Sequence, residues 1–250
     1  MNQPSFAPVF PASNEALEEP NGLIAVGGEL TVDWLLAAYR RGIFPWFSPG
    51  ESILWWTPNP RMVLFPQEFH CSKSLRKVLK KNCYHIAMNT CFDKVMRACA
   101  APRPNAEGTW ISEDMVLAYS ELHRQGYAHS FECYQNETLV GGLYGVKLGD
   151  IFFGESMFSL QADTSKVAFA SLVAMARGDG IKLIDCQIAH PHLASLGARE
   201  ISRDQFEDLL LLSSHDKIGS KSESGRQKTQ REHLLGAWRG SLPLTTEALL

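Results

Sequence analysis

The spacing of hydrophobic and polar positions changes several times along the middle of the chain. Apolar side chains at helical spacing predict helices near 72–81, 91–99, 112–122 and 164–177. A last helix is expected to begin at the capping box formed by Ser202 and Gln205 and to end near Leu212. Alternating or continuous apolar runs predict strands near 84–88, 128–134, 139–147, 151–158 and 181–188. Turn residues at 135–137 and 148–150 separate the three middle strands, so we expect antiparallel hairpins there.

Three regions of different character follow one another along the chain. Residues 1–60 are rich in Pro, Gly and Trp around one helix, which Thr31 caps and Gly42 ends, so we expect a small N-terminal α/β domain. Residues 61–212 carry the predicted order β-α-α-β-β-β-α-β, which resembles the topology of GNAT acyltransferases. We therefore expect an α/β (α+β) fold with a GNAT-like catalytic domain. Residues 213–250 are polar without an apolar period until near their end, and we expect a mobile C-terminal tail.

Two carboxylates interrupt the apolar runs of predicted buried strands. They are Glu155, within Ile151–Phe158, and Asp185, within Ile181–Ile188. Burying an unpaired charge costs several kcal/mol, so such groups are either paired or functional. One interpretation is a structural ion pair or an exposed strand end. Two carboxylates on neighbouring strands, with Gln187 on the same face as Asp185, favour a polar site in an apolar cleft.

Composition narrows the class of protein. The 250 residues are 45% hydrophobic and 20% charged, with a net charge of −3, which is typical of a soluble globular protein and excludes wholesale basicity. No apolar stretch reaches the roughly 18 residues that a membrane span needs, and Met1–Pro20 lacks the pattern of a secretory signal. None of the six cysteines forms a Cys-x-x-Cys pair, so we expect reduced thiols in a cytoplasmic protein. Cys186 adjoins Asp185, which discourages thiolate formation, and is interpreted as a packing cysteine.

Basic and aromatic side chains suggest two possible contacts with nucleic acid. Five basic residues line one face of the predicted helix near 72–81, either as an ordinary solvated face or as a stripe that follows phosphates: Lys73, Arg76, Lys77, Lys80 and Lys81. Trp46 and Trp110 lie in predicted loops, where a ring either packs into the core or stacks on a base.

Familiar cofactor motifs are missing from the sequence. It contains neither a P-loop nor a Rossmann fingerprint. The connection 159–166 has no glycine and includes Asp163, which argues against a CoA pyrophosphate at the following helix. His190 and His192 flank a proline without a matching third ligand, so we expect no metal. The prediction is a site without metal or cofactor.

Longer motifs resemble the bacterial leucyl/phenylalanyl-tRNA–protein transferase family over residues 10 to about 212. The matching segments are Glu19–Leu23 with Gly27–Gly28, Ala38–Phe47, Leu54–Pro58 with Pro60–Arg61, Gly108–Ile111, Leu139–Val146, Phe153–Ser159, Leu183–Gln187 and His192–Ala198. The resemblance implies transfer of Leu or Phe, and Met less well, from aminoacyl-tRNA to proteins with an N-terminal Arg or Lys. The peptide bond formed creates an N-degron that marks the acceptor for degradation. Expected partners are the acceptor stem and 3′ end of Leu-tRNA and Phe-tRNA, and the acceptor proteins, with no membrane.

The same resemblance implies roles for individual residues. Trp46 and Trp110 are expected to clamp the 3′-terminal adenosine, and Glu155, Asp185 and Gln187 to form the catalytic group. The family often has Asn at the position of His190 and Ala at that of Thr164. The expected aminoacyl pocket consists of Tyr39, Tyr119, Met157, Phe169, Leu172 and Ile184.

Several alternatives remain open from the residues. In one mechanism Asp185 polarises the Gln187 amide, and in the one we prefer Asp185 fixes Gln187 and Gln187 orients the attacking amine. Either Glu155 or Asp185 is a candidate partner for the cationic acceptor side chain. A CoA-dependent N-acetyltransferase and a non-catalytic RNA-binding module that uses the basic stripe are the rival functions.

Overall fold

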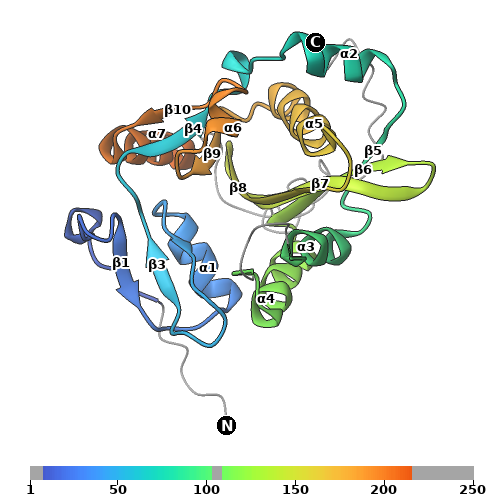
Figure 1. Ribbon diagram of the computed structural model, residues 1–250. Coiled ribbons are helices and arrows are strands. Elements are labelled where there is room, and N and C mark those ends of the chain that lie inside the picture. Colours follow the sequence, from blue (N-terminus) through green and yellow to red (C-terminus); the bar gives the residue numbers. More distant parts are fainter. Residues whose placement is uncertain (1–7, 103–108, 216–250) are drawn as a thin grey trace, which may run out of the picture.

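The computed structural model describes residues 8–102 and 109–215, and within them the chain forms two sheets. The smaller sheet has three short strands in the order β1 (Leu23–Val26), β3 (Leu54–Trp56) and β2 (Phe44–Pro45). Helix α1 (Val32–Tyr39) lies beside this sheet at one side of the molecule (Figure 1). The Thr31 hydroxyl accepts a hydrogen bond from Trp34 N, which confirms the predicted cap.

The larger sheet has seven strands in the order β10-β4-β9-β8-β7-β6-β5. Neighbouring strands are antiparallel except β8 and β9, which pair in parallel. The hairpins predicted between the three middle strands are therefore confirmed. The strands are β4 (Arg61–Leu64), β5 (His85–Met88), β6 (Ala128–Gln135), β7 (Thr138–Leu148), β8 (Ile151–Ser159), β9 (Leu183–Gln187) and β10 (Arg199–Ile201).

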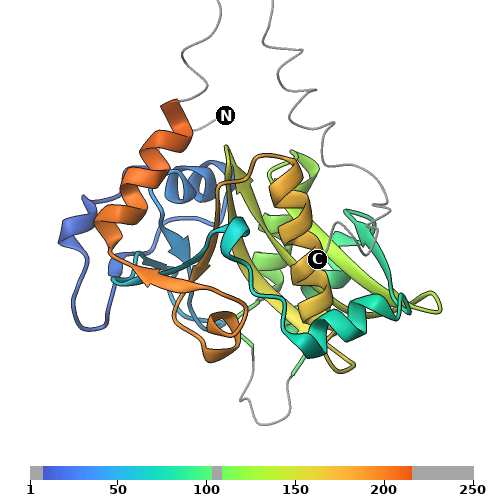
Figure 2. The same cartoon turned by 90° about the horizontal axis from the view of Figure 1, so that it is seen from above.

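Helices cover both faces of this sheet. Helix α5 lies on one face with α2 beside it, while α3 and α4 cover the other face (Figures 1 and 2). The helices are α2 (Lys73–Lys80), α3 (Phe92–Ala100), α4 (Glu113–Arg124), α5 (Thr164–Gly178), α6 (Pro191–Ala194) and α7 (Arg203–His215), with 3-10 turns at Ser13–Glu15 and Pro66–Glu68. Side-chain caps begin two of them as predicted. The Ser112 hydroxyl accepts from Met115 N at 3.2 Å, and Ser202 and Gln205 cap each other's main-chain N–H.

The predicted mixed α/β class and the order of elements from β5 to β9 are confirmed. Two strands of the larger sheet, β4 and β10, were not predicted. Each has only three or four residues, too few to establish an alternating period, and β4 follows directly after Pro60. Together they flank β9 on the side away from β8, so the strand that carries Asp185 is an interior strand.

Two hydrophobic cores lie on opposite sides of the larger sheet. The first packs beneath α1, α3 and α4 and runs in sequence from Phe10 to Phe206, so the N-terminal segment shares a core with the sheet. The second packs beneath α2 and α5. The expected domain boundary at residue 60 coincides with the point where the chain passes from the smaller sheet to the larger one. The division into two domains stays a prediction. Helix α7 continues past the expected end at Leu212, and most of the predicted tail, from residue 216, lies outside the described residues.

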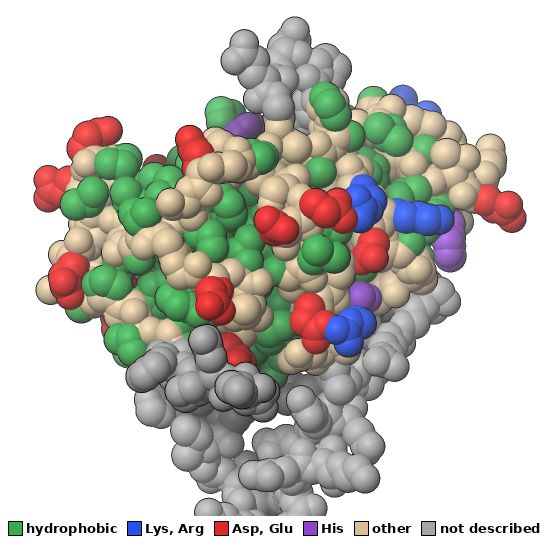
Figure 3. Space-filling model, turned by 90° about the horizontal axis from the view of Figure 1, so that it is seen from below, with side chains coloured by type: hydrophobic (Ala, Val, Ile, Leu, Met, Phe, Trp, Pro, Cys, Tyr) green, Lys and Arg blue, Asp and Glu red, His purple; other side chains and the backbone are tan. Residues whose placement is uncertain are grey.

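Charge is distributed unevenly over the surface. The face opposite to α2 carries acidic side chains over most of its width, and its basic side chains gather on one half (Figure 3). The four basic residues of α2 and Lys81 at its C-cap are all exposed, while Leu75 and Leu79 of the same helix are buried, as predicted for an amphipathic helix. Among the described helices, none has the length and apolar character needed to cross a membrane.

A test of how the smaller region docks is Gly42→Ala. Gly42 has a φ of +70°, and a Cβ there would lie 2.7 Å from a Phe206 ring carbon of α7. We expect the substitution to lower the free energy of unfolding by about 2–4 kcal/mol, since backbone strain and overpacking both contribute. Gly27→Ala is the matched control, because Gly27 has a φ of +88° and open space around it. Equal losses in chemical denaturation would contradict a packing role for Gly42.

Candidate active site

The Asp185 carboxylate is buried in an ion pair with Arg61. Arg61 Nε and Nη2 donate to Asp185 Oδ1 and Oδ2 at 2.8 and 2.7 Å, and the two side chains are 1% and 0% exposed. Residues of β4 and β9 face each other here because the strands are antiparallel neighbours, with Val63 opposite Asp185. A bidentate pair of this geometry satisfies the charge that the apolar strand would otherwise bury.

The Arg61 guanidinium packs against two aromatic rings. Its Cζ is 4.9 Å from the centre of the Phe44 ring of β2 and 4.6 Å from that of Phe206 of α7. Flat guanidinium groups favour such stacking, and desolvation strengthens it. One pair of charged groups therefore joins the N-terminal segment, two strands of the larger sheet and the last described helix.

Gln187 leaves the strand with an unusual main-chain conformation. Its φ is +63°, in the left-handed region that residues other than glycine rarely adopt. Asp185 Oδ1 accepts a hydrogen bond from Gln187 N at 2.9 Å, which stabilises the turn. Gln187 Nε2 in turn donates to Glu155 Oε1 at 2.9 Å. Asp185 thus contacts Gln187 through the main chain, and the carboxylate at the Gln187 amide is that of Glu155.

Glu155 is half-buried at an irregularity in β8. Tyr144 pairs with Ser156 and Gly145 pairs with Gly154, which leaves Glu155 as an extra residue between them. Glu155 Oε2 accepts from the Tyr119 hydroxyl at 3.2 Å, and the Tyr119 and Tyr39 hydroxyls are hydrogen-bonded to each other. Burial raises the Glu155 pKa from 4.5 to about 7. Burial also raises the pKa of both tyrosines well above 10, so they stay protonated as donors.

The six residues of the expected aminoacyl pocket divide between the two cores. Tyr39 and Tyr119 lie in the first core, where their hydroxyls approach Glu155. Regular alternation along β8 would place Met157 on the same face as Glu155, but the extra residue at Glu155 reverses the alternation after it. Four of the six therefore gather on the α5 side of the sheet: Met157, Phe169, Leu172 and Ile184.

The two tryptophans expected to clamp adenosine differ in exposure. Trp46 is 42% exposed, and its ring rests against Trp56, with centroids 5.9 Å apart. Trp110 is half-buried against the first core, two residues after the segment 103–108, which lies outside the described residues. In the part of the chain that is described, the two rings are not in contact with each other. Trp34 and Trp55, by contrast, stack inside the first core.

His190 plays a structural role that the asparagine usual in the family could also play. It is the N-cap of α6, and its Nδ1 accepts a hydrogen bond from His192 N at 3.1 Å. Asparagine is a favoured N-cap for the same reason. Across the described ranges 8–102 and 109–215, no group of three His, Cys, Asp or Glu side chains is arranged to hold a metal ion.

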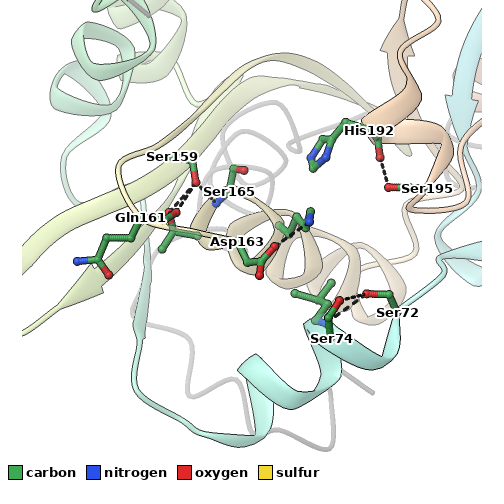
Figure 4. A network of polar contacts seen from close by, with 11 residues as sticks. Ser72, Ser74, Ser159, Gln161, Asp163, Ser165, His192 and Ser195 are labelled. Carbon is green, nitrogen blue, oxygen red and sulfur yellow. Dashed lines mark hydrogen bonds and ion pairs between the residues drawn. The ribbon is translucent and has the colours of Figure 1, made fainter. Parts of the chain in front are cut away.

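In the connection from β8 into α5, the polar side chains bind mainly to other residues of the connection itself (Figure 4). The Ser159 hydroxyl donates to Gln161 O at 2.7 Å and accepts from Ser165 N at 3.4 Å. Asp163 is paired with Lys166 at 2.7 Å. The departure at Thr164 fits this arrangement, because the Thr164 hydroxyl donates to Val140 O at 2.8 Å.

Two further residues bear on the interpretation of the site. Cys186 is partly buried against the second core, and burial raises the pKa of its thiol, which fits a packing cysteine. Arg61 was missed as a site residue by sequence reasoning. The signal was present, because Arg61 is a charge at the start of the apolar run Met62–Leu64, the same pattern that singled out Glu155 and Asp185.

Comparison with known proteins gives matches over most of the chain. Residues 63–211 match the family described as leucyl/phenylalanyl-tRNA protein transferase, and residues 28–59 match the N-terminal domain of that family. A leucyl/phenylalanyl-tRNA–protein transferase of Cellvibrio japonicus is 58% identical over 81% of this chain and 86% of its own length. One of Nitrosomonas eutropha is 57% identical over 80% and 86%. Among solved structures, a GCN5-related N-acetyltransferase of Kribbella flavida aligns with 64% of this chain and 57% of its own, with 8% identity and a TM-score of 0.35.

The raised pKa of Glu155 predicts a pH dependence of stability. Between the ordinary value of 4.5 and about 7, the folded protein holds a proton that the unfolded chain releases, so this group's contribution to stability falls as the pH rises through that range. Glu155→Gln removes the titration. We expect the variant to gain on the order of 2 kcal/mol relative to the parent between about pH 5 and pH 8, measured by urea unfolding. Glu200→Gln, at an exposed position of β10, controls for the lost charge, and parallel curves for Glu155→Gln and the parent would refute the prediction.

Proposed function

Because the chain belongs to the leucyl/phenylalanyl-tRNA–protein transferase family, we propose that it moves leucine or phenylalanine, and methionine less well, onto the N-terminal Arg or Lys of acceptor proteins. Membership makes it an aminoacyltransferase that acts between aminoacyl-tRNA and protein. The new N-terminal residue creates an N-degron that marks the acceptor for degradation. The observation that carries the proposal is the hydrogen-bonded pair of Gln187 and Glu155, which Tyr119 and the Asp185–Arg61 ion pair hold in place.

The chemistry asks for alignment more than for a strong base. The attacking group is an α-amine with a pKa near 8, of which roughly a tenth is neutral at pH 7, and the aminoacyl ester is already activated. The amine nitrogen forms a bond to the ester carbon, the ester C–O bond breaks, and the ribose hydroxyl leaves with a proton. Holding the two reactants in attack geometry supplies several kcal/mol.

Gln187 suits the task of orienting the amine. Its Nε2 is committed to Glu155, which leaves the side-chain carbonyl to accept a hydrogen bond from the acceptor amine. Asp185 supports this role by holding Gln187 N, as in the mechanism where Asp185 fixes Gln187 without polarising it. Asp185 is fully engaged by Arg61, so Glu155 is the better candidate for the cationic side chain of the acceptor.

The apolar group suits an aliphatic or aromatic aminoacyl side chain. Phe169, Leu172 and Ile184 are almost fully buried, and Met157 is partly buried beside them. A pocket of this kind discriminates a missing methylene by only about 1–3 kcal/mol, which fits acceptance of Leu, Phe and, less well, Met. Tyr39 and Tyr119 act from the other side of the sheet, through Glu155.

The tRNA is proposed to approach from the side of α2. Trp46 and Trp110 would hold the terminal adenosine, and the exposed ring of Trp46 is available for stacking. The basic residues of α2 would follow the phosphates of the acceptor stem, while the acidic face of Figure 3 would repel them. We further place the protein in the cytoplasm, where its free cysteines remain reduced.

The deciding experiment is transfer of radiolabelled leucine from Leu-tRNA to peptides that differ in their first residue. We expect peptides beginning with Arg or Lys to be labelled and a matched peptide beginning with Ala to stay unlabelled, because the acceptor side chain pairs with a carboxylate. Phe-tRNA in place of Leu-tRNA should give the same pattern. Tight binding of charged and uncharged tRNA alike, with no transfer to any peptide, would point to the RNA-binding module.

A second prediction concerns the basic stripe. The triple variant Lys73→Gln, Lys77→Gln, Lys80→Gln should raise the KM for Leu-tRNA and flatten its salt dependence, by about 0.7–0.9 in the log–log slope for each phosphate that a lysine no longer neutralises. Transfer from leucyl-adenosine, which lacks the tRNA body, should be unchanged. Lys94→Gln, on the exposed surface of α3, is the control. If the triple variant and Lys94→Gln have the same KM and salt dependence, the basic face of α2 is an ordinary solvated surface.

A further inference from the structure

We infer that Arg61 is a positioning residue for aminoacyl transfer, which fixes Asp185 and through it the main chain and amide of Gln187. This inference rests on the proposed function and adds to it a residue that contacts neither substrate. The connection is continuous in the structure. Arg61 holds both oxygens of Asp185, Asp185 Oδ1 holds Gln187 N at 2.9 Å, and Gln187 Nε2 reaches Glu155 Oε1 at 2.9 Å.

The geometry requires an arginine at this position. Two nitrogens of one flat group meet two carboxylate oxygens, a fit that a lysine ammonium does not reproduce. The guanidinium also lies over the rings of Phe44 and Phe206, which restrict its movement. The third nitrogen, Nη1, is buried and has no hydrogen-bond partner among the described residues. The burial of Arg61 therefore serves the contact with Asp185 at the cost of an unsatisfied donor.

The Gln187 conformation depends on the position of the Asp185 carboxylate. A residue other than glycine at a φ of +63° is strained, and such strain persists only where the surroundings fix it. The bond from Gln187 N to the carboxylate does so, and the bidentate contact with Arg61 holds that carboxylate in place. Without Arg61, the Asp185 carboxylate would lose the partner that holds both of its oxygens, and the Gln187 amide would lose its direction.

Arg61 also acts on the second carboxylate. The groups that face Glu155 are Tyr39 of α1, Tyr119 of α4, Tyr144 of β7, Arg61 of β4, and Asp185 and Gln187 of β9. Within this set Asp185 raises the pKa of Glu155 and Arg61 lowers it, so the two partners of the ion pair act on Glu155 in opposite directions. Removing the charge of Arg61 alone should therefore raise the pKa of Glu155, because Asp185 still acts on it. Neutralising both partners removes both effects and should bring the pKa back toward that of the parent.

The experiment compares single-turnover leucine transfer, with Leu-tRNA and an Arg-peptide both saturating, in the full chain and its variants. The variants are Arg61→Lys, Arg61→Met and the double variant Arg61→Met with Asp185→Asn. Arg97→Met is the matched control, because Arg97 forms an equally well-shaped bidentate pair with Glu113 on the exposed surface. Thermal unfolding of each variant reports the folded fraction under the assay conditions.

We expect Arg61→Met to slow transfer by about 100-fold, the scale of loss for a small misplacement of a reacting group. The KM for Leu-tRNA, measured separately in steady-state assays that vary its concentration, should stay within about threefold of the parent. Arg61→Lys should also be slow although it keeps the charge and folds. The midpoint of the pH–rate profile should move to higher pH in Arg61→Met and return in the double variant. Arg97→Met should match the parent throughout.

A purely structural role for Arg61 would give different results. Folded Arg61→Lys and Arg61→Met with the parental rate and pH profile would overturn the inference, as would a loss of rate that only follows the folded fraction. If the unaltered chain itself transfers nothing to the Arg-peptide, the proposed function fails. If the parent transfers leucine and the Arg61 variants transfer it at the same rate, the proposed function stands and only the inference about Arg61 fails.

Discussion

A carboxylate with no access to water tolerates few arrangements of its neighbours, and the Asp185 carboxylate imposes this constraint on the whole molecule. Its partner Arg61 comes from a strand more than a hundred residues earlier, and the rings that enclose that partner come from β2 and α7. All four elements must therefore reach their places before the charge is satisfied. Elements of both sheets and helix α7 therefore contact one another at the Arg61–Asp185 pair. The polar site extends from this pair through Gln187 to Glu155.

The site also depends on two local departures from regular strands. The extra residue in β8 turns Glu155 toward the tyrosines and returns Met157 to the α5 side. The left-handed turn at Gln187 lets a side chain at the end of β9 reach across to β8. The two departures bring the Glu155 and Gln187 side chains together and leave Met157 on the other side of the sheet, which regular alternation along each strand would not do.

Much of this arrangement was accessible from the sequence. The long periodic helices, the hairpins β6 to β8 and the burial of Asp185 followed from patterns within one segment. Arg61 did not, because β4 is a four-residue strand whose pairing with β9 depends on contacts distant in sequence. The division of the predicted pocket residues between the two sides of the sheet was also not predicted. The alternating pattern of a strand does not reveal an extra residue such as Glu155 in β8. Tyr39 and Tyr119 were expected to line the aminoacyl pocket, whereas the structure places them beside Glu155 on the other side of the sheet from the apolar group.

The Phe206 ring over Arg61 has a consequence for the order of events during synthesis. The ring belongs to α7, the last described helix, whereas the arginine that it covers lies near the start of the larger sheet. A growing chain has already released β4, β8 and β9 from the ribosome before residue 206 emerges, so Asp185 and its partner wait with one side open to solvent. Because α7 is the last described helix, the enclosure of Arg61 is completed only after the rest of the described chain has been made.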